Sequence, residues 1–63
     1  MKRNLLDLHR NFIETQKLQI KLANQLIKYA NYDIKIIVLA NEIIKGCEKA
    51  ISIEQNMMNN YEN

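Results

Sequence analysis

The residues able to do chemistry in this chain are few and widely spaced. Among 63 residues there is one histidine, His9, and one cysteine, Cys47, so no paired His or Cys metal-ligand spacing exists. A metal centre needs three or four converging ligands, and a nucleophile needs a base beside it. The sequence therefore predicts no catalytic residues, no metal site and no cofactor, and we expect a protein that is not an enzyme.

Four polar residues interrupt otherwise apolar stripes: His9, Gln16, Gln19 and Glu54. If the chain folds back on itself at residue 32 or 33, Glu54 lies near Phe12, within one helical turn of His9 and Gln16. Antiparallel packing would thus bring His9 and Glu54 within reach of a charge-assisted contact. Such pairs set the register and the oligomeric state of a helical bundle, which is the role we assign here.

Cys47 lies on an apolar stripe directly after Gly46, the only glycine of the chain. We interpret Cys47 as a small buried packing residue. A glycine inside a helix costs about 1 kcal/mol relative to alanine. Gly46 is therefore expected to permit either a close approach of another helix or a slight bend.

The stripes themselves predict two long helices, at about residues 4–31 and 34–60. Apolar residues recur at i, i+1, i+4, i+7 and i+8, a period that fits a helix and no strand. The absence of proline and the single glycine also argue against a β fold. The predicted seam between the helices consists of Leu6, Ile13, Ile20, Ile27, Ile37, Ile44, Cys47 and Ile51.

The repeat slips by three residues between Ala30 and Ile36. Either a turn at about 31–34 joins two antiparallel helices, or one bent helix contains a stammer. The segment Asn31–Asp33 favours the turn, because asparagine adopts the left-handed conformation that ends a helix and aspartate caps the next one. We therefore predict an all-α fold, one antiparallel helical hairpin over residues 1–63.

A hairpin of this kind is not expected to be monomeric. Its stripe is three heptad rows wide, whereas a two-helix seam covers less, and Leu8, Leu18, Leu22, Leu39 and Ile53 add apolar surface outside the stripe. Two hairpins that pair into a four-helix bundle would cover it. The expected state is a homodimer, with a larger helical oligomer or a hetero-complex as the alternative.

Two long helices with a short turn resemble the plasmid copy-number modulator (Rop) family, whose members are homodimers of helical hairpins that bind paired RNA loops. The resemblance is one of architecture, and no residue motif accompanies it. It implies a four-helix bundle and RNA as a ligand class. The abundance of Asn, Ile and Lys is typical of an AT-rich genome such as that of a phage, a plasmid or a low-GC bacterium.

The net charge of +2 is distributed unevenly, with +4 in residues 1–31 and −2 in residues 32–63. A basic ridge on the first helix could contact nucleic-acid phosphates. Alternatively, a basic and an acidic helix attract each other along an antiparallel seam, which is the interpretation we favour. The candidate nucleic-acid contacts are Arg3, Arg10, Lys17, Lys21 and Lys28.

A reducing cytoplasm is the expected location, because a single cysteine allows no internal disulfide. No membrane association is expected, because the longest apolar run, Ile36–Ala40, is far shorter than the roughly 20 residues of a membrane span.

A small regulator that binds another protein is the function we favour, with a nucleic-acid-binding regulator as the second hypothesis and a structural or assembly protein as the third. The sequence names no particular partner. The candidate protein-contact patch consists of Leu8, Leu18, Leu22 and Tyr29.

Overall fold

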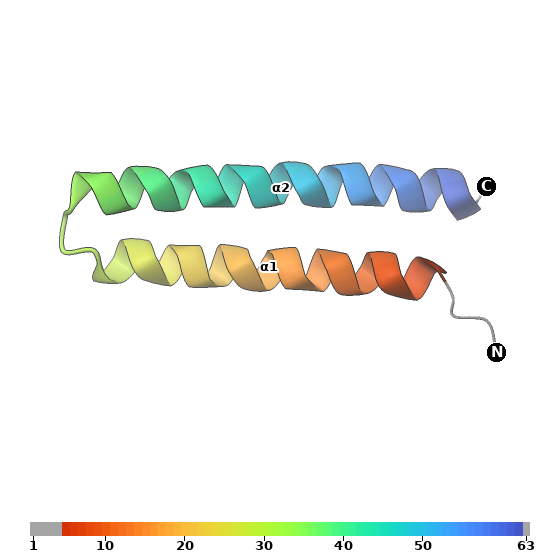
Figure 1. Cartoon of the computed structure of the whole chain (residues 1–63), viewed down its shortest axis with the longest axis horizontal. Coiled ribbons are helices and arrows are strands. Elements are labelled where there is room, and N and C mark those ends of the chain that lie inside the picture. Colours follow the sequence, from red (N-terminus) through yellow and green to blue (C-terminus); the bar gives the residue numbers. More distant parts are fainter. Residues whose placement is uncertain (1–4, 63) are drawn as a thin grey trace.

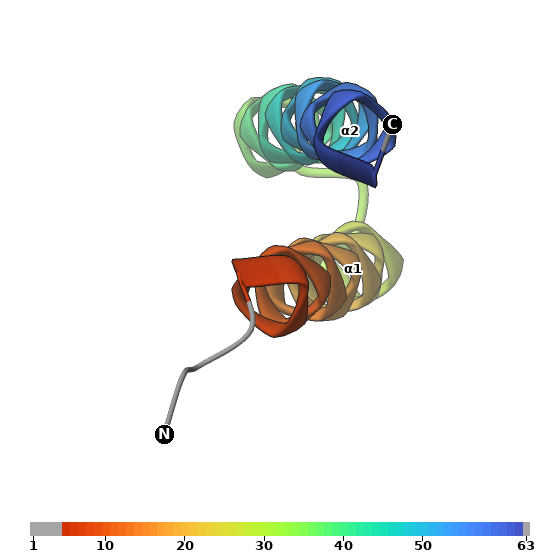
Figure 2. The same ribbon diagram turned by 90° about the vertical axis from the view of Figure 1, so that its right-hand side faces the viewer.

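The chain folds into two antiparallel helices, which confirms the predicted hairpin and excludes the single bent helix. A computed structural model describes residues 5–62, and their side chains as far as residue 60. Helix α1 (Leu5–Tyr29) and helix α2 (Ile34–Glu62) run side by side along the whole molecule (Figure 1). Seen end-on, they form one layer of two helices (Figure 2). The Cα trace is 48 Å long and 11 Å deep.

The helices begin and end close to the predicted boundaries. Helix α1 ends at Tyr29, two residues earlier than predicted, because the backbone already turns at Ala30. Helix α2 begins at Ile34 as predicted and continues to Glu62, two residues beyond the predicted end. Residue 4, at which the first helix was predicted to begin, lies outside the described residues.

The turn uses the two residues that the sequence singled out. Asn31 has a φ of 53°, in the left-handed region. The Asp33 carboxylate accepts hydrogen bonds from the amides of Lys35 (3.0 Å) and Ile36 (3.4 Å), which caps α2. The Asp33 amide in turn donates to the Ala30 carbonyl at 3.0 Å and closes the turn. Unexpectedly, Tyr32 also has a positive φ, 64°.

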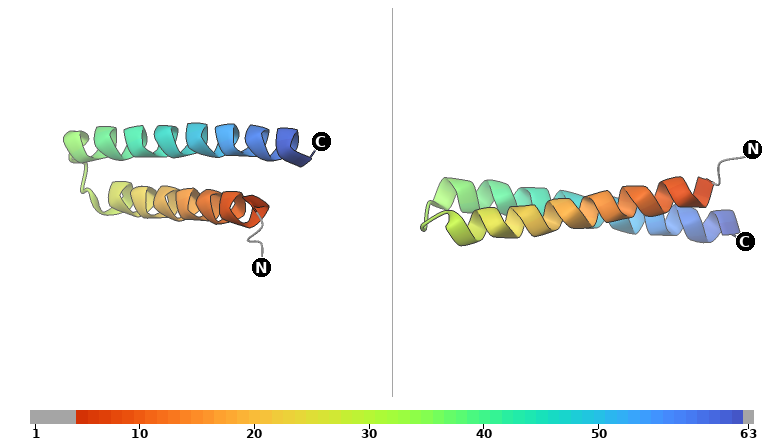
Figure 3. Two further views of the ribbon diagram at one scale, coloured as in Figure 1. Left: turned by 45° about the vertical axis from the view of Figure 1, so that its right-hand side comes forward. Right: turned by 90° about the horizontal axis from the view of Figure 1, so that it is seen from below.

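Burial is confined to the line where the two helices meet, and Figure 3 shows them crossing slightly along that line. The buried side chains are all apolar or thiol, and most are small: Ile13, Ala23, Ala30, Ala40 and Cys47. Of the eight predicted seam residues, Ile13 and Cys47 are buried. The other six, Leu6, Ile20, Ile27, Ile37, Ile44 and Ile51, are half-buried.

Neither helix of the described part is long and apolar enough to cross a membrane.

We expect Tyr32→Gly to stabilise the hairpin. The Tyr32 side chain is 91% exposed and its backbone is left-handed, a conformation that costs tyrosine more than glycine, so the free energy of unfolding should rise by about 0.5–1 kcal/mol. Urea denaturation followed by circular dichroism measures this change. Asn24→Gly, at an exposed helical position of α1, is the control and should lower the same free energy by a similar amount. A loss of stability in Tyr32→Gly would show that the Tyr32 side chain holds the turn.

Candidate functional site

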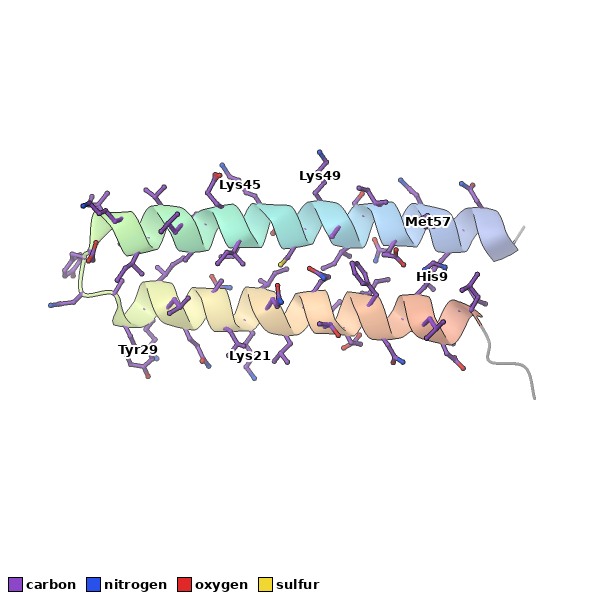
Figure 4. All side chains as sticks on the ribbon, in the orientation of Figure 1. His9, Lys21, Tyr29, Lys45, Lys49 and Met57 are labelled. Atoms are coloured by element: carbon purple, nitrogen blue, oxygen red, sulfur yellow. The ribbon has the colours of Figure 1, made fainter. Side chains whose placement is uncertain are left out.

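The predicted contact between His9 and Glu54 is confirmed. The Nδ1 atom of His9 is hydrogen-bonded to the Oε2 atom of Glu54, a contact that is an ion pair when the imidazole is protonated, and the two side chains are only 13% and 16% exposed. His9 lies between the helices, near the end of the hairpin away from the turn (Figure 4). The pair thus joins the N-terminal part of α1 to the C-terminal part of α2 and fixes their register.

Gln19 and Cys47 form the second polar contact across the seam. The Cys47 thiol is buried and lies 3.5 Å from the Gln19 Oε1 atom, to which it donates a weak hydrogen bond. The contact places Gln19 level with Cys47. Cys47 is therefore buried, as predicted, and its sulfur is turned toward α1.

These polar side chains do not assemble into a metal site. In the described part of the chain, no three His, Cys, Asp or Glu residues lie close enough together to hold a metal ion. The contacts His9–Glu54 and Gln19–Cys47 are separated by about two turns of α2, so each is an isolated crosslink between the helices.

Among the side chains of residues 5–60, one broad face of the hairpin has no charged group, and we call it the charge-free face. On each helix it contains two rows of the seven-residue repeat that lie side by side on the same flank of the seam. Most of its large residues are exposed by 39–64%, and Tyr29 at its border by 77%. In α1 the row nearest the seam is Leu5, Phe12, Gln19 and Leu26, and the outer row is Leu8, Thr15, Leu22 and Tyr29. In α2 the row nearest the seam is Ile36, Ile43, Ala50 and Met57, and the outer row is Leu39, Gly46, Ile53 and Asn60.

Two shallow hollows lie on this side of the molecule. The first is lined by residues of both helices, namely Gln19, Leu22, Ala23, Leu26 and Ile43. Since Leu26 and Ile43 line the same hollow, the rows of α1 and α2 do share one face. The second hollow, at the outer border of α1, is lined by Leu22, Gln25, Leu26 and Tyr29. Both hollows are open and mostly apolar, so they suit protein side chains better than a charged ligand.

Within residues 5–60, the charged residues of the two helices, apart from the seam pair His9–Glu54, occupy the remaining surface. Lys45 and Lys49 point outward from α2, and Lys21 points outward from α1 (Figure 4). We call this the charged surface. Its members are Asp7, Arg10, Glu14, Lys17, Lys21 and Lys28 of α1, and Lys35, Glu42, Lys45, Glu48 and Lys49 of α2.

The candidate nucleic-acid contacts lie on the charged surface, but acidic side chains interrupt them. The Arg10 guanidinium lies 3.6 Å from the Asp7 carboxylate, and the Lys17 ammonium lies 3.7 Å from that of Glu14. The Lys28 ammonium lies 5.7 Å from the centre of the Tyr29 ring. Arg3 is outside the described residues. The structure therefore provides a mixed surface in place of a continuous basic ridge.

The favoured charge interpretation also needs revision. Within residues 5–60, His9–Glu54 is the one ion pair that joins the helices, and the other two pairs lie within α1. The basic and acidic side chains point away from the seam, where solvent screens them. Apolar packing therefore holds the helices together, and attraction between the two helices contributes little.

The candidate protein-contact patch lies along the border between the two surfaces. Leu8, Leu22 and Tyr29 form the outer row of the charge-free face on α1. Leu18 precedes Leu22 by one turn and points away from α2, on the outermost row of α1. All four side chains are exposed, between 47% and 77%.

Sequence reasoning missed how the apolar stripe divides between the seam and the surface. Leu5, Phe12 and Leu26 belong to the stripe but are exposed by 40–51%. The stripe is three rows wide and the seam takes two of them, so the third row had to be left over. The spacing of seven also places Leu39, Gly46 and Ile53 in one row of α2, beside the row of Ile36, Ile43 and Met57.

No family model, curated protein or solved structure matches the chain. The interpretation of the charge-free face therefore rests on its own residues, and the resemblance to the plasmid copy-number modulators stays one of architecture.

Replacing one partner of the His9–Glu54 pair should lower the free energy of unfolding more than replacing both partners. We expect Glu54→Leu to lower the free energy of unfolding by about 1–2 kcal/mol, because it leaves the half-buried His9 ring without its partner. The double variant His9→Leu with Glu54→Leu should recover most of that loss, since two leucines pack at the same place. Urea denaturation of the wild type, both single variants and the double variant gives the coupling energy. Additive losses would contradict this account of the pair.

Proposed function

We propose that this chain is a small non-enzymatic regulatory protein that acts by binding another protein. Its working form is a homodimer in which two hairpins pack their charge-free faces together as a four-helix bundle. The observation that supports this proposal is the charge-free face itself: as far as the side chains are described, to residue 60, the charged residues of both helices outside the seam all lie elsewhere. A buried free thiol is compatible with a reducing compartment, and we place the protein in the cytoplasm.

The size of the charge-free face supports dimerisation. The hairpin is 48 Å long, and two adjacent helices are about 20 Å wide, so the face covers roughly 900 Å². Apolar patches of more than a few hundred Å² are uncommon on monomers, and a stable protein interface buries about 800 Å² on each partner. A second hairpin therefore matches both the extent and the chemistry of this face.

Covering the face also gives the monomer the core that it lacks. Only five side chains are buried within the described residues, four of them no larger than cysteine. A seam of this kind contributes too little apolar burial to hold 63 residues with a comfortable margin. Burial of Leu5, Phe12, Leu26, Ile43 and Met57 against a second copy supplies the missing contacts.

The protein-contact patch Leu8, Leu18, Leu22 and Tyr29 suits the partner protein. Leu18 lies outside the proposed dimer interface, whereas Leu8, Leu22 and Tyr29 form its outermost row on α1. Leu18 and the outer edge of that row therefore stay accessible in the bundle. The hollow between Leu22 and Tyr29 offers a place for an apolar side chain, and tyrosine is a frequent hot-spot residue. The proposed occupant is an apolar helix face of the partner, laid along the outer edge of α1.

Two leucines of α1 provide a matched pair for testing the dimer. Leu26 is 51% and Leu18 is 55% exposed, but only Leu26 lies on the charge-free face. Leu26→Glu should weaken the dimer by about 100-fold or more, because it buries an unpaired carboxylate at the interface. Leu18→Glu should leave the dimer intact. Sedimentation equilibrium at micromolar concentration measures both. A monomeric wild type, or equal behaviour of the two variants, would defeat the proposed dimer.

Partner binding should follow the opposite pattern. The wild type should retain its partner protein from nuclease-treated extract of its native host. Leu18→Glu, which keeps the dimer, should not retain the partner, because Leu18 belongs to the contact patch. Lys49→Glu, on the outer side of α2, is the matched control and should retain that protein. Quantitative mass spectrometry of the retained material measures the difference. Equal retention by both variants would remove the patch from the binding site.

A second candidate function is nucleic-acid binding by the charged surface. It is favoured by the position of Arg10, Lys17, Lys21 and Lys28, which stay outside the proposed dimer interface. The carboxylates beside Arg10 and Lys17 count against it. On the favoured proposal, wild-type affinity for RNA or DNA at about 0.15 M salt should be no tighter than nonspecific binding, roughly 10⁻⁴–10⁻⁶ M.

A triple variant decides between these two functions. If the charged surface reads phosphates, changing Arg10, Lys17 and Lys21 to Gln should weaken binding and reduce the salt dependence by about one unit for each lost phosphate contact. Fluorescence anisotropy over a salt series measures both quantities. Submicromolar wild-type binding that disappears in the triple variant would establish the nucleic-acid function in place of the protein-binding one.

A further inference from the structure

Gly46 is a costly residue that nothing inside the hairpin explains. It lies within the long helix α2, where a glycine costs about 1 kcal/mol relative to alanine. A Cβ atom built on Gly46 would meet nothing within 4 Å, so no neighbour in the described structure requires its absence. Its φ is not in the left-handed region either. The described hairpin therefore gives no reason for a glycine here, whereas the close approach of another chain would.

The position of Gly46 indicates where that reason lies. Gly46 is on the charge-free face, and Ala50, one turn later, is on the same face in the row nearest the seam. Leu39 and Ile43 precede this pair, and Ile53 and Met57 follow it. The face of α2 thus has large apolar side chains toward both ends and a shallow notch at Gly46 and Ala50.

We infer that the occupant of the charge-free face is a second copy of this chain whose α2 crosses the first α2, antiparallel, at Gly46 and Ala50. This inference rests on the proposed homodimer and adds the helix pair and the point of closest approach. Without side chains larger than a methyl group at the notch, the two backbones can approach closely there.

The place of the notch along the helix supports a second copy as the occupant. Glu48 stands midway along α2 (Ile34–Glu62), between Gly46 and Ala50. A two-fold axis through this point makes the two α2 helices overlap along their full length, with the turns at opposite ends. Both charge-free faces are then covered over the whole 48 Å. In a symmetric pair, a notch away from the centre would leave one end of each α2 uncovered, so the central position matches a second copy.

The part of α1 that lies level with Gly46 explains why the two α2 helices, and not the two α1 helices, make the closer contact in the inferred dimer. Gln19 lies level with the notch, because its Oε1 accepts the hydrogen bond from Cys47. Thr15 lies one turn earlier on the same face, and its hydroxyl donates to the Asn11 carbonyl at 2.9 Å. The middle of α1 is thus polar and wider than that of α2. The two α1 helices therefore stand further apart than the two α2 helices in the inferred dimer.

The decisive variant is Gly46→Leu. A Cβ atom at position 46 meets nothing in the hairpin, the position is exposed, and leucine is the better helix former, so helicity at low concentration should be unchanged or higher. The dimer dissociation constant should nevertheless rise by about 10- to 100-fold, because the side chain fills the space that the second α2 occupies. The control is Lys49→Leu, which adds a leucine to the outer side of α2 and should leave dimerisation unchanged. Sedimentation equilibrium and circular dichroism measure the two effects.

Crosslinking tests the crossing point independently. In a Cys47→Ala background, Ala50→Cys mixed with Gly46→Cys should form an intermolecular disulfide on mild oxidation, because a two-fold axis at the level of Glu48 places position 50 of one copy opposite position 46 of the other. Lys49→Cys in the same background should stay unlinked in dilute solution. Non-reducing electrophoresis distinguishes these results.

The outcomes separate the inference from the function on which it rests. If Gly46→Leu dimerises as the wild type does, while Leu26→Glu dissociates, the homodimer stands and the crossing at Gly46 is wrong. If the wild type is monomeric at all accessible concentrations, both are wrong. Weakened dimerisation in Gly46→Leu, together with the crosslink between Ala50→Cys and Gly46→Cys, establishes the crossing.

Discussion

Two helices that pack side by side can cover only two rows of side chains on each other, and this limit determines the rest of the structure. Here each helix has apolar residues in more than two rows. The hairpin seam takes the rows that contain Ile13 and Ala23 in α1 and Ile44 and Cys47 in α2. The remaining apolar rows of both helices face the same way, because the charged residues occupy the opposite flank. One molecule therefore has a narrow core and a broad uncovered face.

The turn determines which rows face each other. The capping of α2 by Asp33 and the left-handed residues Asn31 and Tyr32 reverse the chain within four residues. This short connection fixes the axial register, and the His9–Glu54 pair fixes it again at the opposite end. A longer loop would have allowed the helices to rotate and bury other rows. The charge-free face thus results from the turn as much as from the apolar pattern.

Much of this fold could be predicted from the sequence, since its strongest signals are local. The repeat of seven predicts the helices, and the slip of three residues near Asn31 predicts the hairpin. The His9–Glu54 contact follows from antiparallel register alone. The left-handed Tyr32 could not be predicted, because a bulky residue rarely adopts this conformation and the turn imposes it.

The division of the stripe between the seam and the exposed face was also beyond sequence reasoning. It depends on how far each helix rotates about its own axis, and neighbouring rows such as those of Leu5 and Leu6 differ by only one residue. The significance of Gly46 became visible only when the space around it was known to be empty. A sequence shows that the glycine is costly, whereas the structure shows that none of the described residues requires it.

The distribution of side-chain sizes along the seam has a consequence for the order in which the hairpin folds. The small buried residues Ala23, Ala30 and Ala40 all lie in the half nearer the turn. Contacts there close short loops and order few rotamers, so they form with the smallest loss of conformational entropy. His9 and Glu54, separated by 45 residues, form the contact that closes one of the longest loops. Folding is thus expected to proceed like a zipper from the turn, and slow hydrogen exchange should be concentrated in the half nearer to it.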